Sequence, residues 1–279
     1  MHLYRTTIEG RTALARDDGG TLVAVHELPP ALAAIAPCLP FDPAAAAAGA
    51  DLGPVVDAEL LAPLSPGKIV AIGLNYQDHI VESGLQAPAQ PLVFAKFTSS
   101  VIGPRDAIVI DRAITRRVDW EVELAVVIGR RMRSVAASAA LDHVAAYTVA
   151  NDVSARDVQF GDGQWVRGKS LDTFCPVGPC LVTAEEFGDP QSKRLWTLVN
   201  GERVQDSDTS KMVFGVAELL AFCCASFTLE PGDLLLTGTP WGCGEFMSPP
   251  RSLADGDVVE TGVEGIGSLV NTVVDQPHR

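Results

Sequence analysis

The feature that most constrains the fold is residues 118–129, where an acidic alternation passes directly into an unbroken aliphatic run. The aliphatic half is rich in β-branched residues and ends in a glycine, which is the pattern of a buried strand. In the other half apolar and acidic residues alternate, so an extended chain would place Asp119, Glu121 and Glu123 on one face. The stretch therefore predicts a core strand that begins with an acidic face.

Two interpretations of that acidic face are open. Three carboxylates on one face repel one another unless a cation or a set of hydrogen-bond donors lies among them. Mg²⁺ and Ca²⁺ prefer carboxylate oxygens, and Mg²⁺ takes few protein ligands because it keeps several waters. The face is then either a metal platform on a rigid strand or the solvated side of an edge strand, and the alternation alone does not decide between them.

The charge balance limits the kinds of partner. The 279 residues include 21 Lys and Arg against 35 Asp and Glu, a formal net charge of −14. This surplus argues against nucleic acid or an anionic membrane as a partner. It leaves room for a small anionic substrate, since a metal ion and a few basic groups can reverse the potential locally.

Cysteine usage and the N-terminus indicate the compartment. The first ten residues contain no apolar signal core, no later run is long enough to span a bilayer, and the six cysteines form no C-x-x-C pair. Reduced thiols fit best, so we expect a cytoplasmic protein.

Two parts of the chain differ in character. Residues 1–64 mix short strand-like pieces with prolines, which predicts a small N-terminal domain. In residues 65–279 strands dominate with a few helices, which predicts a larger domain of class α+β around a large curved sheet. The expected strands are 68–73, 91–96, 108–110, 146–150 and 234–237, with two more in 257–274 and an Asn-Gly hairpin in 196–204. One helix is expected to begin near Tyr76 with Asn75 as its cap, and two more are expected near 135–144 and in 213–222. Residues 161–168 are expected to form a mobile, glycine-rich loop.

Three polar residues outside the acidic stretch suggest chemistry. Asp152 follows an apolar strand; such a residue is ordinarily a turn or cap residue, but beside the acidic platform it is the natural third oxygen ligand. His79 and Glu82 are three apart on a predicted helix and so share a face. A glutamate beside an imidazole holds one tautomer and favours the protonated form, as a general base acting on water requires. The alternative is a plain surface pair.

Four further residues have both a functional and an ordinary interpretation. Lys169 follows the glycine-rich segment and is either solvated or a point charge for a developing oxyanion. Arg156 and Gln159 could orient a substrate, although each alone is typical of a surface. Thr239 lies in a Gly-Thr-Pro turn that could face an anion. The chain shows no phosphate-binding loop, dinucleotide fingerprint, nucleophile elbow or zinc-type cysteine spacing.

Taken in order, these stretches resemble the fumarylacetoacetate hydrolase family. Each motif is weak alone, and their order across residues 66–274 makes the signal specific. The motifs are Gly-Leu-Asn-Tyr-Gln-Asp-His at 73–79, Asp-x-Glu-x-Glu at 119–123, Asn-Asp-Val-Ser-Ala-Arg-Asp at 151–157, Gly-Lys-Ser at 168–170, Val-Asn-Gly-Glu at 199–202, Pro-Gly-Asp at 231–233 and Thr-Gly-Thr-Pro at 237–240.

The resemblance implies a mixed β-roll or β-sandwich catalytic domain, usually a homodimer, that holds Mg²⁺, Mn²⁺ or Ca²⁺. It points to the acylpyruvase-like and 2-hydroxyhepta-2,4-diene-1,7-dioate isomerase-like branch. The matched positions are the metal ligands Glu121, Glu123 and Asp152, the water-activating pair His79 and Glu82, the oxyanion lysine Lys169, and the substrate-contacting Arg156, Gln159 and Thr239. Asp78 matches a metal ligand of the larger members only and is left out of the site.

The implied activity is metal-dependent hydrolysis of a C–C bond in a 2,4-dioxo acid. Such a keto acid would chelate the ion through its carboxylate and enolate oxygens while the histidine activates water. Decarboxylation of oxaloacetate-like acids and isomerisation of unsaturated dicarboxylates are alternatives on the same scaffold, and a binding scaffold without turnover is the non-enzymatic one. The family's Pro-Ala-Gly-Val-Gly turn is here Pro-Trp-Gly-Cys-Gly at 240–244, and this bulk beside the pocket weakens the expectation of the usual small substrates.

Overall fold

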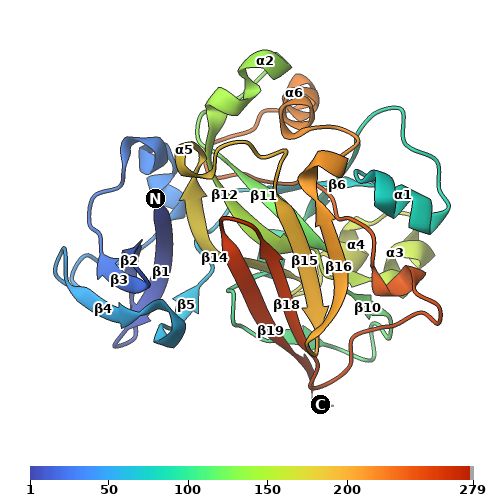
Figure 1. Cartoon of the computed structure of the whole chain (residues 1–279), viewed down its shortest axis with the longest axis horizontal. Coiled ribbons are helices and arrows are strands. Elements are labelled where there is room, and N and C mark those ends of the chain that lie inside the picture. Colours follow the sequence, from blue (N-terminus) through green and yellow to red (C-terminus); the bar gives the residue numbers. More distant parts are fainter. Residues whose placement is uncertain (277–279) are drawn as a thin grey trace.

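A long mixed sheet and a second, five-stranded sheet form the framework of the computed structural model, which describes residues 1–276 (Figure 1). The long sheet has the order β4-β3-β2-β1-β14-β12-β11-β17-β6-β7, and the five-stranded sheet has the order β16-β15-β18-β19-β9. Helices are few and short, which confirms the predicted α+β class. None of the helices within the described residues is long and apolar enough to cross a bilayer.

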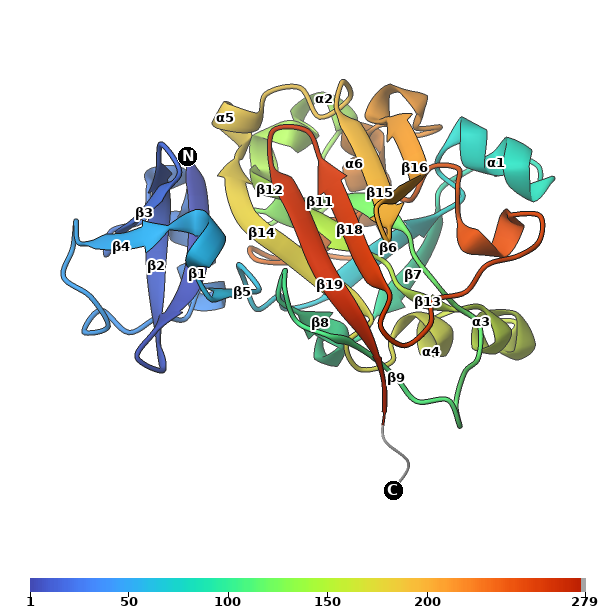
Figure 2. The same ribbon diagram turned by 60° about the horizontal axis from the view of Figure 1, so that its bottom comes forward.

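The first 64 residues lie to one side of the molecule in both views (Figures 1 and 2). Their elements are β1 (His2–Ile8), β2 (Arg11–Asp18), β3 (Thr21–Ala24), η1 (Pro30–Cys38), β4 (Asp51–Pro54), η2 (Val55–Asp57) and β5 (Leu60–Leu61). β1 pairs with β14 through Leu3 and Leu181, so this part extends the long sheet. Within the predicted segment 65–279, the last three residues lie outside the described part of the chain.

The remaining elements alternate strands with short helices. Before the central strands come β6 (Ile69–Gly73), α1 (Gln77–Ser83), β7 (Leu92–Lys96), η3 (Thr98–Ser100), β8 (Val101–Ile102) and β9 (Ile108–Ile110). The central part holds β10 (Val118–Asp119), β11 (Val122–Ile128), α2 (Ala137–Ala140), η4 (Leu141–His143), β12 (Val144–Asn151), β13 (Ser154–Ala155), α3 (Arg156–Asp162), α4 (Val166–Lys169), β14 (Cys175–Thr183) and α5 (Ala184–Phe187). The chain then forms β15 (Arg194–Val199), β16 (Glu202–Asp208), η5 (Thr209–Lys211), α6 (Val216–Ser226), β17 (Leu234–Leu236), η6 (Gly244–Phe246), β18 (Val258–Val263) and β19 (Gly267–Asp275).

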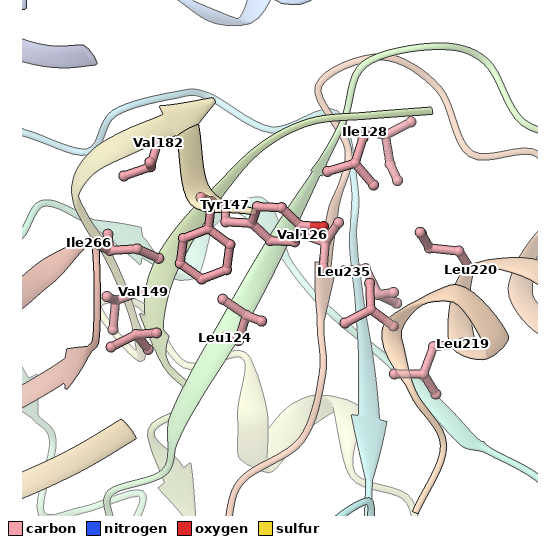
Figure 3. Close-up of a cluster of buried hydrophobic side chains, with 14 of the residues drawn as sticks. Leu124, Val126, Ile128, Tyr147, Val149, Val182, Leu219, Leu220, Leu235 and Ile266 are labelled. Atoms are coloured by element: carbon pink, nitrogen blue, oxygen red, sulfur yellow. The ribbon is translucent and has the colours of Figure 1, made fainter. Parts of the chain in front are cut away.

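β11 is a central strand, which excludes the edge-strand interpretation of the acidic stretch. It pairs with β12 on one side and with β17 on the other, and all its residues are buried. Leu124 and Val126 pack on one face with Tyr147 of β12 and with Leu219 of α6 (Figure 3). The alternation therefore places an aliphatic layer on one side of the strand, as the sequence predicts.

The Asn-Gly hairpin is present between β15 and β16. Asn200 and Gly201 both have positive φ, 53° and 79°, which a type I′ turn requires and which these two residue types tolerate best. The predicted hairpin is confirmed, and it forms two strands of the sheet that packs over the core (Figure 2).

Two local predictions are wrong, and a third is confirmed in part. Asn75 does not cap α1: the N-cap residue is Tyr76, and the Asn75 amide bonds the backbone of Phe214 and Thr237. Most of residues 161–168 belong to α3 and α4, and Gly163, with φ 66°, ends α3 in a left-handed cap. The helix predicted near 135–144 is present over residues 137–143, where the α-helical turn α2 continues into the 3₁₀ turn η4.

Candidate active site

The three predicted metal ligands come together where β11 begins and β12 ends. Val122 pairs with Asn151, and the amide of Asp152 donates to the Glu121 carbonyl at 2.8 Å, so Asp152 lies beside Glu121. Glu123 follows on β11. One carboxylate oxygen from each of the three acids lies within 4.8 Å of the other two, and all three side chains are buried. We call Glu121, Glu123 and Asp152 the acidic triad.

Three buried cations surround the triad. The Lys169 ammonium lies 2.6 Å from Glu121 Oε2 and 2.7 Å from Asp152 Oδ2. Arg156 Nη1 is 2.6 Å from Glu121 Oε1, and Lys96 Nζ is 2.6 Å from Asp152 Oδ1. Although burial lowers it, the Asp152 and Glu121 carboxylates raise the pKa of Lys169, so this side chain stays an ammonium.

Lys96 is a site residue that sequence analysis missed. It ends the strand β7 with a side chain fully removed from solvent. The available signal was the one used for Asp152, a charged residue at the end of an apolar strand. A lysine at a strand end is so often solvated that this signal does not distinguish the two outcomes.

Asp119 is directed away from the triad despite the alternation. Its carboxylate accepts hydrogen bonds from Arg156 Nε at 2.9 Å and from the amide of Gly244 at 2.7 Å. The reason is that residues 120 and 121 leave the ladder between β10 and β11, which breaks the period of two. Asp119 thus fixes Arg156 and the segment after Gly242 rather than offering a ligand.

The titration of the triad fits a cation site. Burial, followed by the charges of Asp152 and Glu121, raises the pKa of Glu123 well above its ordinary value. Burial also raises the pKa of Glu121, but Lys169 and Arg156 outweigh this effect and hold it at about 2. At Glu123, Lys169 and the amide of Gly238 offset the raising effect only in part, so the chain compensates its charge less well than that of Glu121. A donor set made only of carboxylate oxygens suits a hard divalent ion such as Mg²⁺, Mn²⁺ or Ca²⁺.

His79 and Glu82 form the predicted pair on α1. His79 Nδ1 lies 2.7 Å from Glu82 Oε1, and the other Glu82 oxygen accepts the amide of Gly242 at 2.8 Å. Phe246 packs edge-on against the imidazole at 5.4 Å between ring centroids. Because the carboxylate holds a proton on Nδ1, the lone pair of the neutral ring is on Nε2.

A cavity of about 60 Å³ is lined by His79 of the pair and by Glu121 of the triad. Its polar lining residues are His79, Glu121, Arg156, Gln159, Lys169 and Thr239. Its apolar wall is formed by Ile72, Leu74, Leu85, Phe94, Phe160, Trp165 and Phe246. The volume corresponds to roughly four to six water positions, which is room for a small acid.

The predicted substrate-contacting residues line the cavity and are held by the protein. Gln159 Oε1 accepts from Arg156 Nη1 at 3.1 Å, which orients the Gln159 amide. Thr239 Oγ1 accepts from Gln205 Nε2 at 3.0 Å, which leaves the hydroxyl proton free to donate. Gln205 also accepts the amide of Val122 at 3.0 Å, so this buried residue of β16, which sequence analysis missed, links the second sheet to the site.

The bulky turn does not narrow the cavity through its tryptophan. Trp241 is 42% exposed, and its indole Nε1 donates to the Asp206 carbonyl at 3.0 Å. Glu245 forms an ion pair with Arg117 at the surface. Asp78 accepts from Ser207 Oγ at 2.5 Å and braces α1 against β16.

The site thus consists of a buried acidic triad and a neighbouring His–Glu pair, with His79 and Glu121 in the lining of one small cavity. The chain belongs to the fumarylacetoacetate hydrolase family: the family model described as fumarylacetoacetate (FAA) hydrolase C-terminal matches residues 68–274. The predicted family is thereby confirmed.

Three similar proteins illustrate the range of the family. The mitochondrial oxaloacetate tautomerase Fahd2a of Rattus norvegicus is 46% identical over 232 residues, which are 82% of this chain and 74% of the relative. The 2,4-didehydro-3-deoxy-L-rhamnonate hydrolase of Sphingomonas sp. (strain SKA58) is 46% identical over 254 residues, 88% of this chain and 89% of the relative. The crystal structure of 2-hydroxyhepta-2,4-diene-1,7-dioate isomerase from Mycobacterium marinum matches with a TM-score of 0.81 at 37% identity and covers 100% of both chains.

Adding Mg²⁺ should raise the melting temperature of the protein. An ion that binds only the native state at 100 times its Kd stabilises by about 2.7 kcal/mol, which corresponds to about 5 °C or more for a chain of this size. Differential scanning fluorimetry with EDTA and then with a Mg²⁺ series measures the shift. A melting temperature that is the same in EDTA and in excess Mg²⁺ would show that the triad holds no ion.

Replacing Lys96 by methionine should lower the free energy of unfolding by about 3 kcal/mol. Methionine keeps the apolar stem of Lys96 but removes the charge, so the Oδ1 atom of Asp152 loses its buried partner. Urea denaturation measures the change. Lys193→Met, at a partly exposed position, is the matched control, and equal stability of both variants would contradict the prediction.

Proposed function

We propose that this protein is a metal-dependent hydrolase that cleaves the C–C bond between C3 and C4 of a 2,4-dioxo acid. The observation that supports it most is the His79–Glu82 pair, 2.7 Å apart, with its imidazole lining the same cavity as Glu121 and Lys169. A general base, an anion-stabilising ammonium and a cation site at one cavity are the parts that hydrolysis of such an acid needs.

The roles of the side chains follow from their contacts. Glu82 holds the proton on His79 Nδ1, so Nε2 accepts a proton from water, and the carboxylate stabilises the imidazolium that forms. The hydroxide adds to the C4 carbonyl. Lys169 has three N–H donors and uses two on Glu121 and Asp152, which leaves one for the new oxyanion.

Bond cleavage then completes the reaction. The electron pair of the C3–C4 bond passes into the pyruvate part as an enolate, which takes a proton at C3, and C4 leaves as a carboxylic acid. A divalent ion on the triad would supply a Lewis acid for the oxygens of the 2-oxo acid. Arg156 keeps Glu121 and Asp119 in place, and Thr239 and Gln159 offer hydrogen bonds to the substrate.

The name of the Sphingomonas relative supports hydrolysis. Its substrate is a 2,4-didehydro sugar acid, which has carbonyl groups at C2 and C4, and that protein matches nearly the whole chain. Hydrolysis at carbon–carbon bonds of ketonic substrates is therefore our proposal for this chain also.

Keto–enol tautomerisation or isomerisation is the second candidate. The rat relative is named as an oxaloacetate tautomerase, and the Mycobacterium marinum structure as an isomerase. Each of these reactions, like decarboxylation of oxaloacetate, moves charge into an enolate but needs no attack by water. A binding scaffold without turnover is the alternative from another class, and the intact set of base, lysine and acidic triad argues against it.

The products of a substrate panel separate these functions. Acylpyruvates, oxaloacetate and an unsaturated 2-hydroxy dicarboxylate are each incubated with the protein and Mg²⁺, and the products are identified by NMR. Hydrolysis yields pyruvate and a second acid, decarboxylation yields CO₂, and isomerisation yields one product of unchanged mass. Absence of pyruvate from every acylpyruvate would reject the proposed hydrolase.

Two further proposals concern the state of the protein in the cell. We propose a homodimer located in the cytoplasm, acting on a small keto acid without nucleic acid or membrane partners. The mitochondrial name of the rat relative makes the location worth testing directly. Light scattering after gel filtration measures the oligomeric state, and cell fractionation measures the location.

A further inference from the structure

The His–Glu pair and Cys243 together form a second group of side chains of the metal-ligand type. Cys243 Sγ lies 3.9 Å from His79 Nδ1, and Glu82 Oε1 lies 2.7 Å from the same nitrogen. One ligand atom from each of the three residues lies within 4.8 Å of the other two. Cys243 comes from the unusual turn before η6, whereas the other two residues belong to α1.

The donor atoms of this group differ in kind from those of the acidic triad. A thiolate, an imidazole and a carboxylate are the ligand types of zinc, whereas three carboxylates suit a hard ion such as Mg²⁺. Ligands of a tetrahedral zinc ion are about 3.3–3.8 Å apart. The Cys243–His79 separation is already close to this range, and the Glu82 side chain, only partly buried, needs to move by about half an ångström to reach it.

We propose that His79, Glu82 and Cys243 form a second, zinc-selective site, and that zinc bound there inhibits the enzyme. The ion takes the place of the proton between His79 and Glu82; this proton is released to solvent while Nε2 takes one up, so the ring stays neutral. The Cys243 thiol loses its proton to solvent as it becomes a ligand. Water or a small anion completes the coordination.

Inhibition follows from the tautomer of the imidazole, and this step rests on the proposed hydrolase. In the metal-free pair the proton is on Nδ1 and the Nε2 lone pair is available to water. With zinc on Nδ1, the neutral ring carries its proton on Nε2 and has no lone pair there. The base is then lost while the acidic triad is unchanged.

Cobalt spectroscopy tests the site independently of catalysis. Co²⁺ is titrated into the full-length protein in excess Mg²⁺, and the near-ultraviolet thiolate-to-cobalt charge-transfer band is recorded. The wild type should show this band at one equivalent, zinc should displace it, and Cys243→Val should lack it. Cys38→Val, the same change at a half-buried cysteine outside the group, should retain it.

Calorimetric zinc titrations provide the second readout. Removing a hydrogen-bond partner of a metal ligand typically lowers metal affinity by about 10–100-fold. Removing the thiolate ligand itself should therefore raise the zinc Kd by about 100-fold or more. Cys243→Ser replaces Cys243→Val if the latter fails to fold. A band that is absent from the wild type, or a zinc Kd that is equal in the wild type and the Cys243 variant, overturns the site.

The activity measurement distinguishes inhibition from binding. Each variant is compared with its own zinc-free rate, and the inhibitory zinc concentration should rise by about 100-fold in the Cys243 variant. Zinc that binds through Cys243 without slowing the reaction overturns the inhibitory role. A wild type that hydrolyses no dioxo acid rejects the proposed function, and the cobalt band still decides the site.

Discussion

Replacing His79 by asparagine should lower kcat for an acylpyruvate by about 10²–10⁴-fold with little change in KM. Asparagine can still bond Glu82 but cannot accept a proton from water, so the general base is removed while the surroundings are kept. The effect is confined to kcat because the imidazole acts on the attacking water and not on the bound acid. Steady-state kinetics at saturating Mg²⁺ measures both constants.

Two further variants control this experiment. Val81→Asn introduces the same residue on the same helix at a position that is 81% exposed, and it should leave both constants unchanged. Glu82→Gln keeps the shape of the pair but no longer favours the imidazolium, so its kcat should fall as well. Equal activity of His79→Asn and Val81→Asn would exclude the histidine as the base. It would then favour the tautomerase alternative, which needs no attack by water.

Replacing Glu123 by glutamine should lower kcat/KM by at least about 10³-fold, because the ion that it helps to hold supplies several kcal/mol of charge stabilisation in the transition state. The same variant should be as stable as the wild type in EDTA, or more stable. Glutamine still accepts the amide of Gly238, and it removes the carboxyl group whose pKa is raised by burial and by its acidic neighbours. Activity falls while stability does not.

This combination separates a metal ligand from a structural residue. The variant should also lose the rise in melting temperature on adding Mg²⁺, which is measured on the same samples. Glu185→Gln, at an exposed position, should keep both the activity and the response to Mg²⁺. A Glu123→Gln protein that is much less stable in EDTA, or that still responds fully to Mg²⁺, would argue against the assignment.

Some parts of the site are predictable from local pattern. The aliphatic run of β11 and the acidic residues before it identify a buried strand that contains Glu123 and directly follows Glu121. An i, i+3 spacing identifies His79 and Glu82 as neighbours. Asp152 is recognisable because it follows an apolar strand. These inferences hold because strand and helix geometry fix which side chains share a face.

Other parts depend on the path of the backbone. Asp119 shares the alternation with Glu121, yet a break of two residues between β10 and β11 sends it to Arg156 instead. Lys96 and Gln205 reach the site from strands far away in sequence, and their own neighbours in the sequence do not indicate it. The segment predicted as a glycine-rich loop is mostly helical. Gly163 ends α3 in a left-handed cap, and α4 begins at Val166.

The sequence by itself determined the family, the α+β class, a buried strand and most of the candidate site residues, since these follow from local periodicity and from ordered motifs. Only the tertiary structure decided which charged and metal-binding groups meet: three buried cations pair with Glu121 and Asp152 of the triad, and Cys243 lies beside His79. The physical reason is that electrostatic and coordination energies depend on distances between residues remote in sequence, which pairing of strands sets and composition does not.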